Sequence, residues 1–176
     1  MYYSERSLYL SEQHTWETAM SVADLFFSTK GRIGRGKWWA GVIALGVLNT
    51  AVTLILFKVL GWNMVSRIVY GAWSLAMLYP AYCVLAKRFQ DRDERPILAQ
   101  IAIAVAAVQV VLTVLALTNP FEPNMLGNVV SIVQGILGLV FLVMLGCLRG
   151  TVGDNRFGPD PLPAAPYGTQ QPIPTK

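Results

Sequence analysis

Four stretches of this chain carry no charged residue, and each is long enough to cross a lipid bilayer. They cover residues 38–57, 68–86, 97–118 and 125–148. About 20 helical residues span a hydrocarbon core of roughly 30 Å. Lipid offers the backbone no hydrogen-bonding partner, so such spans must be helical. We therefore expect an all-α membrane protein whose four transmembrane helices, at about 38–58, 67–86, 97–118 and 125–148, form an antiparallel bundle.

The composition agrees with a membrane protein and weighs against other classes. Hydrophobic residues make up 54% of the chain and charged residues 14%, against about 25% charged in an average soluble domain. The net charge of +4 comes from residues that flank apolar runs, without a basic recognition helix, so nucleic acid is not an expected partner. Cys83 and Cys147 lie within apolar runs and His14 stands alone, so we expect no metal site and no cofactor.

The distribution of basic residues predicts the orientation in the membrane. Positive charge favours the cytoplasmic side, and only Lys58 and Arg67 flank the spans on the poorer side. We expect both termini in the cytoplasm, on the richer side, together with Lys30, Arg32, Arg35, Lys37, Lys87, Arg88, Arg92, Arg95, Arg149 and Arg156.

The segments before and after the spans differ from each other. Residues 1–37 form a cytoplasmic segment in which 11–27 have the spacing of an amphipathic helix, either on the membrane surface or packed on the protein. Residues 149–176 form a Gly/Pro-rich tail, and from about 163 we expect disorder.

Polar motifs stand at the cytoplasmic edges of the spans, in GRIGRGKWW, KRFQDRDERP and GTVGDNRFGPDP. We expect them to converge on a polar platform, within which Arg156 could contact Asp91 or Asp93. The alternative is a solvated loop in which Lys87 and Arg88 merely extend from the second span toward water. The candidate platform residues are Arg32, Arg35, Trp38, Trp39, Lys87, Arg88, Asp91, Asp93, Asn155 and Arg156.

These three motifs together resemble the bacterial inner-membrane proteins of the domain-of-unknown-function family 805. GRIGRGKWW is similar to its G-R-x-x-R-x-x-aromatic-W entry, KRFQD to its basic-basic-apolar-H-D segment, and GTVGDNRFGPDP to its closing G-T-x-G-x-N-R-aromatic-G-x-D-P. The resemblance covers about residues 27–162 and implies a small four-span protein of the inner (plasma) membrane. Gln90 departs from the pattern, which usually has His there, and glutamine cannot titrate.

We interpret the chain as a non-enzymatic membrane protein whose platform binds anionic lipid headgroups or a protein partner, which includes a second copy of the chain. One alternative is a membrane-surface enzyme that uses Asp91 and Asp93 on a lipid-linked substrate. A small-solute transporter or channel is disfavoured, because the spans lack the ionisable residues that mark transport pathways.

Overall fold

Four long apolar helices dominate the computed structural model, which describes residues 20–119, 122 and 124–162. They are α3 (Arg35–Leu60), α4 (Met64–Asp91), α5 (Ile97–Val114) and α6 (Met125–Phe141), and α6 continues into a π-helical turn, η1 (Leu142–Cys147). Each of the four is long and apolar enough to cross a membrane. The expected all-α membrane fold is thus confirmed.

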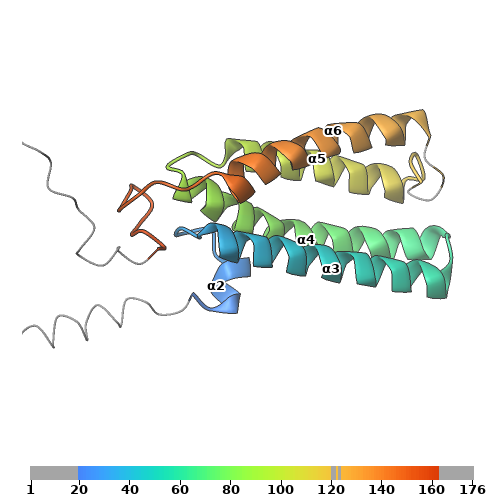
Figure 1. Ribbon diagram of the computed structural model, residues 1–176. Coiled ribbons are helices and arrows are strands. Elements are labelled where there is room, and N and C mark those ends of the chain that lie inside the picture. The colour runs from blue at the N-terminus through green and yellow to red at the C-terminus, as the bar shows by residue number, and fades with distance from the viewer. Residues whose placement is uncertain (1–19, 120–121, 123, 163–176) are drawn as a thin grey trace, which may run out of the picture.

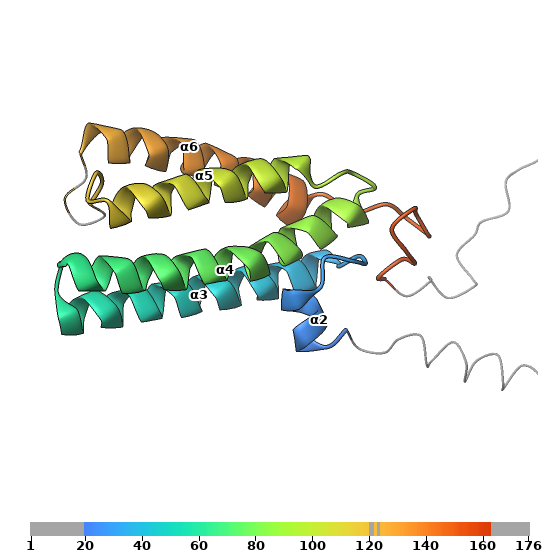
Figure 2. The ribbon, with the colours of Figure 1, turned by 180° about the vertical axis from the view of Figure 1, so that it is seen from behind.

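The helices form two antiparallel hairpins, α3–α4 and α5–α6, which meet along α4 and α5 (Figures 1 and 2). A second contact between the hairpins is made by η1, at the end of α6, which lies against α3 and α4. One end of the molecule carries the short helix α2 (Val22–Phe27), the α4–α5 connection and the segment after η1 (Figure 1). We call this the α2 end, and the end with the two hairpin turns the opposite end.

The α3–α4 turn at the opposite end is short, because its own residues supply the hydrogen bonds that the terminal backbone groups of the two helices need. Gly61 ends α3 with a φ of 70°, which costs glycine little. Asn63 then caps α4: its Oδ1 accepts from Ser66 N at 3.0 Å, and Ser66 Oγ accepts from Asn63 N at 3.0 Å. This reciprocal capping box aligns α3 and α4 side by side.

The largest departures from the expected spans are at the ends of α4 and α5, and both have identifiable reasons. α4 runs past residue 86 to Asp91, because the charged side chains of its last turn are bound by protein groups instead of water. α5 ends at Val114, where Ala116 takes a φ of 60° and the chain turns back. The hydroxyl groups of Thr113 and Thr118, 3.1 Å apart, join across that turn.

The N-terminal amphipathic helix expected over 11–27 is not confirmed. Residues 11–19 lie outside the described residues, Met20 and Ser21 are not helical, and α2 covers only Val22–Phe27. Ser21 caps α2 by accepting from Asp24 N at 3.0 Å. The tail expected to be disordered from about 163 also lies outside the described residues.

The buried apolar core lies at the α2 end, where α3, α4, α5, α6 and η1 come together and partly buried side chains of α2 pack against them. Phe89 and Phe141 meet edge to face there, with ring centroids 5.7 Å apart. Elsewhere most apolar side chains of the four helices are exposed, as expected for surfaces that face hydrocarbon. The core therefore supports the polar motifs, and its members are Ile33, Trp38, Val84, Phe89, Ala99, Phe141 and Leu145.

Candidate functional site

Asp91, the last residue of α4, places a buried carboxylate between two guanidinium groups. Arg32 Nε donates to Asp91 Oδ1 at 3.2 Å, and Arg88, one helical turn earlier, forms an ion pair with Oδ2. The exposed fractions are 3% for Asp91, 5% for Arg32 and 1% for Arg88. Charges buried this deeply are tolerated only where partners and hydrogen bonds replace water. This cluster, Arg32–Asp91–Arg88, is the centre of the α2 end.

Arg32 also attaches the segment after η1 to this cluster. Its Nη1 donates to the carbonyl oxygens of Gly153 (2.7 Å) and Gly158 (3.1 Å), and its Nη2 donates to Thr151 O (2.7 Å). Thr151 N in turn donates to Asp91 O at 2.8 Å. Arg32 thus joins the start of the chain's membrane domain to its end.

The turn that Arg32 holds is built from side-chain and backbone bonds within residues 151–160. Asn155 Nδ2 donates to Gln90 O at 2.9 Å and to Thr151 Oγ1 at 2.9 Å. Asp160 accepts from Gly153 N at 2.8 Å. Burial alone would raise the pKa of Asp160, but the N–H groups of Leu162 and Gly153, with nearby arginines, hold it below its usual range. Its carboxylate therefore stays charged and keeps the turn closed.

Gly150 lies so close to Asp91 that no side chain fits there. A Cβ atom on Gly150 would stand 2.0 Å from Asp91 Oδ2 and 2.8 Å from Asp91 O. The second atom belongs to the backbone, so a rotation of the Asp91 side chain would not remove the conflict. The glycine of the GT motif is therefore needed for the close approach of two chain segments.

Side chains from three segments cap the C-terminal end of the last helix. The final carbonyl groups of a helix lack intrahelical partners and carry partial negative charge, which cations stabilise. Here each of five consecutive carbonyl oxygens accepts a side-chain hydrogen bond. The bonds are Arg92 Nη1 to Met144 (3.1 Å), Arg88 Nε to Leu145 (2.7 Å), Trp39 Nε1 to Gly146 (3.4 Å), Arg35 Nη1 to Cys147 (3.0 Å) and Arg88 Nη2 to Leu148 (2.6 Å).

The two tryptophans of GRIGRGKWW have different surroundings. Trp38 is 3% exposed and packs in the core, whereas Trp39 is 37% exposed. Both rings press on Gly146 of η1, where an added Cβ would lie 2.9 Å from each. The pair therefore joins α3 to the end of the last helix, and of the two only Trp39 has the exposure of an interfacial anchor.

Lys87 is buried but does not belong to the Arg32–Asp91–Arg88 cluster. Its Nζ donates to the carbonyl oxygens of Asp24 and, at 3.0 Å, of Leu25. Gln90, one turn along the same face, donates to Thr29 O at 3.0 Å. These two side chains hold α2 and the strand-like segment after it against α4.

Asp93 forms a separate, exposed pair with Arg156. Arg156 Nε lies 3.0 Å from Asp93 Oδ1, and its Nη2 donates to Asp93 O at 2.6 Å. Both side chains are about half exposed, so the pair adds little stability. Of the two partners considered for Arg156, the structure pairs it with Asp93, while Asp91 is bound by other arginines. In the described part of the chain, no group of three His, Cys, Asp or Glu residues is arranged to hold a metal ion.

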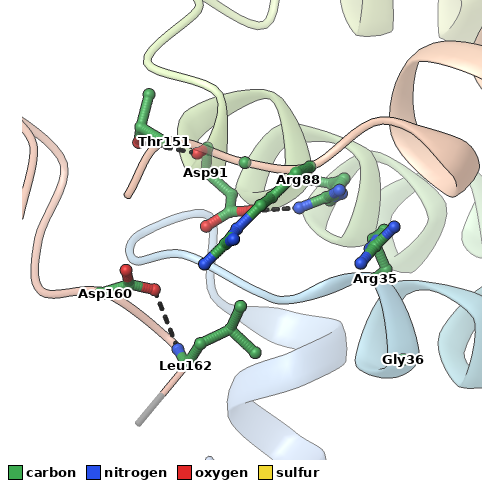
Figure 3. Close-up of a pocket in the computed structure, with 9 residues that line it drawn as sticks. Arg35, Gly36, Arg88, Asp91, Thr151, Asp160 and Leu162 are labelled. Carbon is green, nitrogen blue, oxygen red and sulfur yellow. Dashed lines mark hydrogen bonds and ion pairs between the residues drawn. The ribbon is translucent and has the colours of Figure 1, made fainter. Parts of the chain in front are cut away.

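A polar cavity of about 190 Å³ opens beside the cluster (Figure 3). Arg35 and Arg149 are exposed at its rim, whereas Arg88 and Asp91 form its buried wall. Arg88 is already bound to Asp91, Leu145 O and Leu148 O, so the guanidinium groups that could bind the oxygens of an oxyanion are those of Arg35 and Arg149. The lining residues are Arg35, Gly36, Arg88, Asp91, Arg149, Gly150, Thr151, Asp160 and Leu162.

Comparison with known proteins assigns the chain to a family. Residues 26–159 match the model of the family described as "Protein of unknown function (DUF805)". The chain belongs to the DUF805 family. It is 30% identical over 143 residues to the Escherichia coli K12 "Uncharacterized protein YiiR", covering 80% of this chain and 90% of that one. It is 24% identical over 144 residues to the E. coli K12 "Inner membrane protein YhaH", covering 81% and 93%. No solved structure matches.

This DUF805 chain is thus a multi-pass membrane protein with an inner-membrane relative, and the family resemblance is confirmed. The structure brings Arg32, Arg88, Asp91 and Asn155 into one hydrogen-bonded network, with Arg35 and the two tryptophans on the adjoining helix end. Three motifs far apart in the sequence are therefore neighbours in space.

Sequence reasoning missed the parts of this DUF805 site that are backbone or small residues. Gly150 and Thr151 make the close contact with Asp91, and both stand inside a motif already singled out. The five acceptor carbonyls of Met144–Leu148 leave no trace in residue type. One sequence signal could have indicated these acceptors. The motifs contain more arginines than carboxylates, so some of the arginines must donate to backbone carbonyl groups.

Proposed function

We propose that this DUF805 protein lies in the bacterial inner membrane with both termini in the cytoplasm, and that its α2 end binds anionic lipid headgroups without catalysing a reaction. The proposal has two parts, an orientation and a binding surface, and each has its own support and its own test.

The orientation is supported by where the basic residues lie in the fold. Exposed basic residues at the α2 end include Lys30 between α2 and α3, Lys37 in the first turn of α3, and Arg149 after η1. The opposite end has Lys58 and Arg67 near its turns. Excess Lys and Arg beside the spans marks the cytoplasmic side, so the α2 end is assigned to the cytoplasm.

A labelling experiment checks this orientation. In a variant with Cys83→Ser and Cys147→Ser, a membrane-impermeant maleimide on spheroplasts should label Arg67→Cys but not Lys30→Cys. After permeabilisation both positions should react, because Lys30 is exposed and Arg67 is half-exposed. Labelling of Lys30→Cys in intact spheroplasts would contradict the orientation.

The binding surface consists of the cations that the protein itself leaves exposed. Arg32 and Arg88 are buried and their nitrogens are taken up by protein oxygens, so they support the architecture. The exposed cations at the same end are Lys30, Arg35, Lys37, Arg95, Arg149 and Arg156, of which Arg35 and Arg149 line the cavity. A Lys or Arg near an anionic leaflet contributes about 1 kcal/mol of attraction.

The observation that carries the proposal is the position of Arg35 and Arg149 at the rim of the 190 Å³ cavity. Arg35 is the first residue of α3, a helix expected to enter the membrane there. A headgroup at this depth would meet two exposed guanidinium groups and the N-terminal N–H groups of α3, which favour anions.

The contacts of the carboxylates weigh against the alternative of a membrane-surface enzyme. Asp91 is bound by Arg32 and Arg88, and Asp93 by Arg156, so neither is placed to act as a base on a substrate. A protein partner at the same surface is the competing outcome of the binding test.

Lipid binding is tested with the full chain in nanodiscs that contain phosphatidylglycerol and phosphatidylcholine. Arg35→Gln and Arg149→Gln should each lower the enrichment of phosphatidylglycerol around the protein about fivefold, as expected for about 1 kcal/mol per cation. The measurement is native mass spectrometry of the retained lipid.

The matched control is Arg156→Gln, which removes an exposed arginine at the α2 end that does not line the cavity. It should leave the enrichment nearly unchanged. Equal retention of phosphatidylglycerol in all variants would overturn the lipid proposal, and capture of a protein sensitive to Arg35 and Arg149 would assign the surface to a protein partner.

A further inference from the structure

A second cavity, of about 720 Å³, lies at the opposite end of the molecule. Its lining residues come from the last turns of α3, from Trp62 after α3, and from Asn119 and Glu122 between α5 and α6. Its volume falls in the range of ligand sites, about 300–1,000 Å³. The lining residues are Leu54, Ile55, Phe57, Lys58, Trp62, Asn119 and Glu122.

The wall of this cavity is preformed and faces the membrane. The ring centroids of Phe57 and Trp62 are 4.8 Å apart, and those of Phe57 and Tyr70 5.6 Å, so packed aromatic rings fix one side. Leu54 and Ile55, 56% and 63% exposed, form the other side. They belong to an apolar helix long enough to span the bilayer. A helix in the bilayer is surrounded by lipid acyl chains, so an acyl chain is the expected occupant of this side.

Apolar contact alone would give a lipid no preference for this cavity, because bilayer hydrocarbon is as apolar as leucine. Selective binding must therefore come from the charged lining residues. Lys58 stands in the last turn of α3 and Glu122 in the α5–α6 connection. Both are exposed, and no ion pair joins them among the described residues.

We propose that this cavity, here called the hairpin cavity, binds a phospholipid with a zwitterionic headgroup that carries a primary amine. The phosphate lies by Lys58, the ammonium group donates to the Glu122 carboxylate, and an acyl chain fills the apolar part. A purely anionic headgroup satisfies Lys58 but meets repulsion from Glu122. A quaternary ammonium has no N–H group to donate to Glu122.

The test uses the full chain reconstituted in vesicles with equal parts of phosphatidylethanolamine, phosphatidylglycerol and phosphatidylcholine. Native mass spectrometry after gentle extraction should find phosphatidylethanolamine retained above phosphatidylcholine, the zwitterionic lipid without an N–H group, whereas retained phosphatidylglycerol reports on the α2 end. Lys58→Gln and Glu122→Gln should each lower this preference about fivefold, the size of one interfacial charge contact. Exchange of the two charges, in Lys58→Glu with Glu122→Lys, should restore part of it.

Blocking the apolar part separates this cavity from ordinary annular lipid. Ile55→Trp should abolish the retained phosphatidylethanolamine, whereas Ile43→Trp, at a position of similar exposure on α3 outside the cavity, should not. Arg156→Gln, at an exposed position of the α2 end that lines neither cavity, should also leave it unchanged.

Three outcomes would overturn the proposal. They are equal retention of phosphatidylethanolamine and phosphatidylcholine, retention of phosphatidylethanolamine that survives Ile55→Trp, and a lipid-free dimer that Ile55→Trp dissociates. The last outcome would assign the hairpin cavity to a second copy of the chain.

Discussion

Replacement of Arg88 by methionine should destabilise the fold by about 3–5 kcal/mol, the cost of breaking a buried ion pair. Methionine keeps the apolar length of the side chain but removes the charge beside Asp91 and the donors to Leu145 O and Leu148 O. Asp91 would keep one cationic partner, Arg32, and two carbonyl groups at the helix end would lose theirs. Reversible unfolding in detergent, followed by tryptophan fluorescence, measures the loss.

Two companion variants identify the cause. Arg156→Met removes an exposed arginine from the same end and should cost less than about 1 kcal/mol. Arg88→Lys restores the charge but cannot reach three acceptors at once, since lysine lacks the fork of a guanidinium, so it should recover only part of the stability. If Arg88→Met unfolded at the same denaturant concentration as Arg156→Met, the structural role argued for Arg88 would be wrong.

The second large effect is expected at Gly150, where alanine should cost about 1–3 kcal/mol through overpacking. The added Cβ conflicts with both the carboxylate and the backbone carbonyl of Asp91, so the segment after it must move away. Thr151 would then lose its bonds to Asp91 and Arg32. Limited trypsin cleavage at Arg156 should become faster, by roughly 30-fold for a loss of about 2 kcal/mol, because cleavage follows the population of the open segment.

Gly36→Ala is the matched control, because Gly36 lines the same cavity but a Cβ there meets nothing within 4 Å. It should leave both the unfolding midpoint and the cleavage rate close to those of the natural chain. Equal cleavage rates for the Gly150 and Gly36 variants would mean that the segment does not pack on Asp91 as described.

Both predictions concern the α2 end, where most of the buried charged groups hold the helices together. Arg32, Arg88 and Arg92 each donate to backbone carbonyl oxygens, so these arginines tie the first and last helices to α4. Ligand binding is left to exposed cations such as Arg35 and Arg149. The motif residues of this DUF805 chain therefore serve mainly to join the helix ends of a small membrane fold. The proposed lipid sites use side chains that remain exposed.

The candidate site shows how far residue types predict a structure. The residues that meet at Asp91 could be chosen from the sequence because charged and aromatic side chains at the edge of a span have few alternatives to mutual contact. Their roles could not be assigned, because Lys87 and Arg88 are adjacent in the sequence yet contact α2 and η1 respectively. A helix turns by about 100° per residue, so adjacent side chains have different neighbours.

Residue type alone indicated four helices long and apolar enough to span a membrane, because an uncharged run of that length has no other stable state in lipid, although α4 and α5 end elsewhere than expected. Which of the charged side chains are buried and which remain exposed depends on the tertiary fold. Arg32 and Arg35 look alike in the sequence, but Arg32 is 5% exposed while Arg35 is exposed at a cavity rim. That difference depends on carbonyl oxygens more than 100 positions away, and residue type does not record where a backbone will lie.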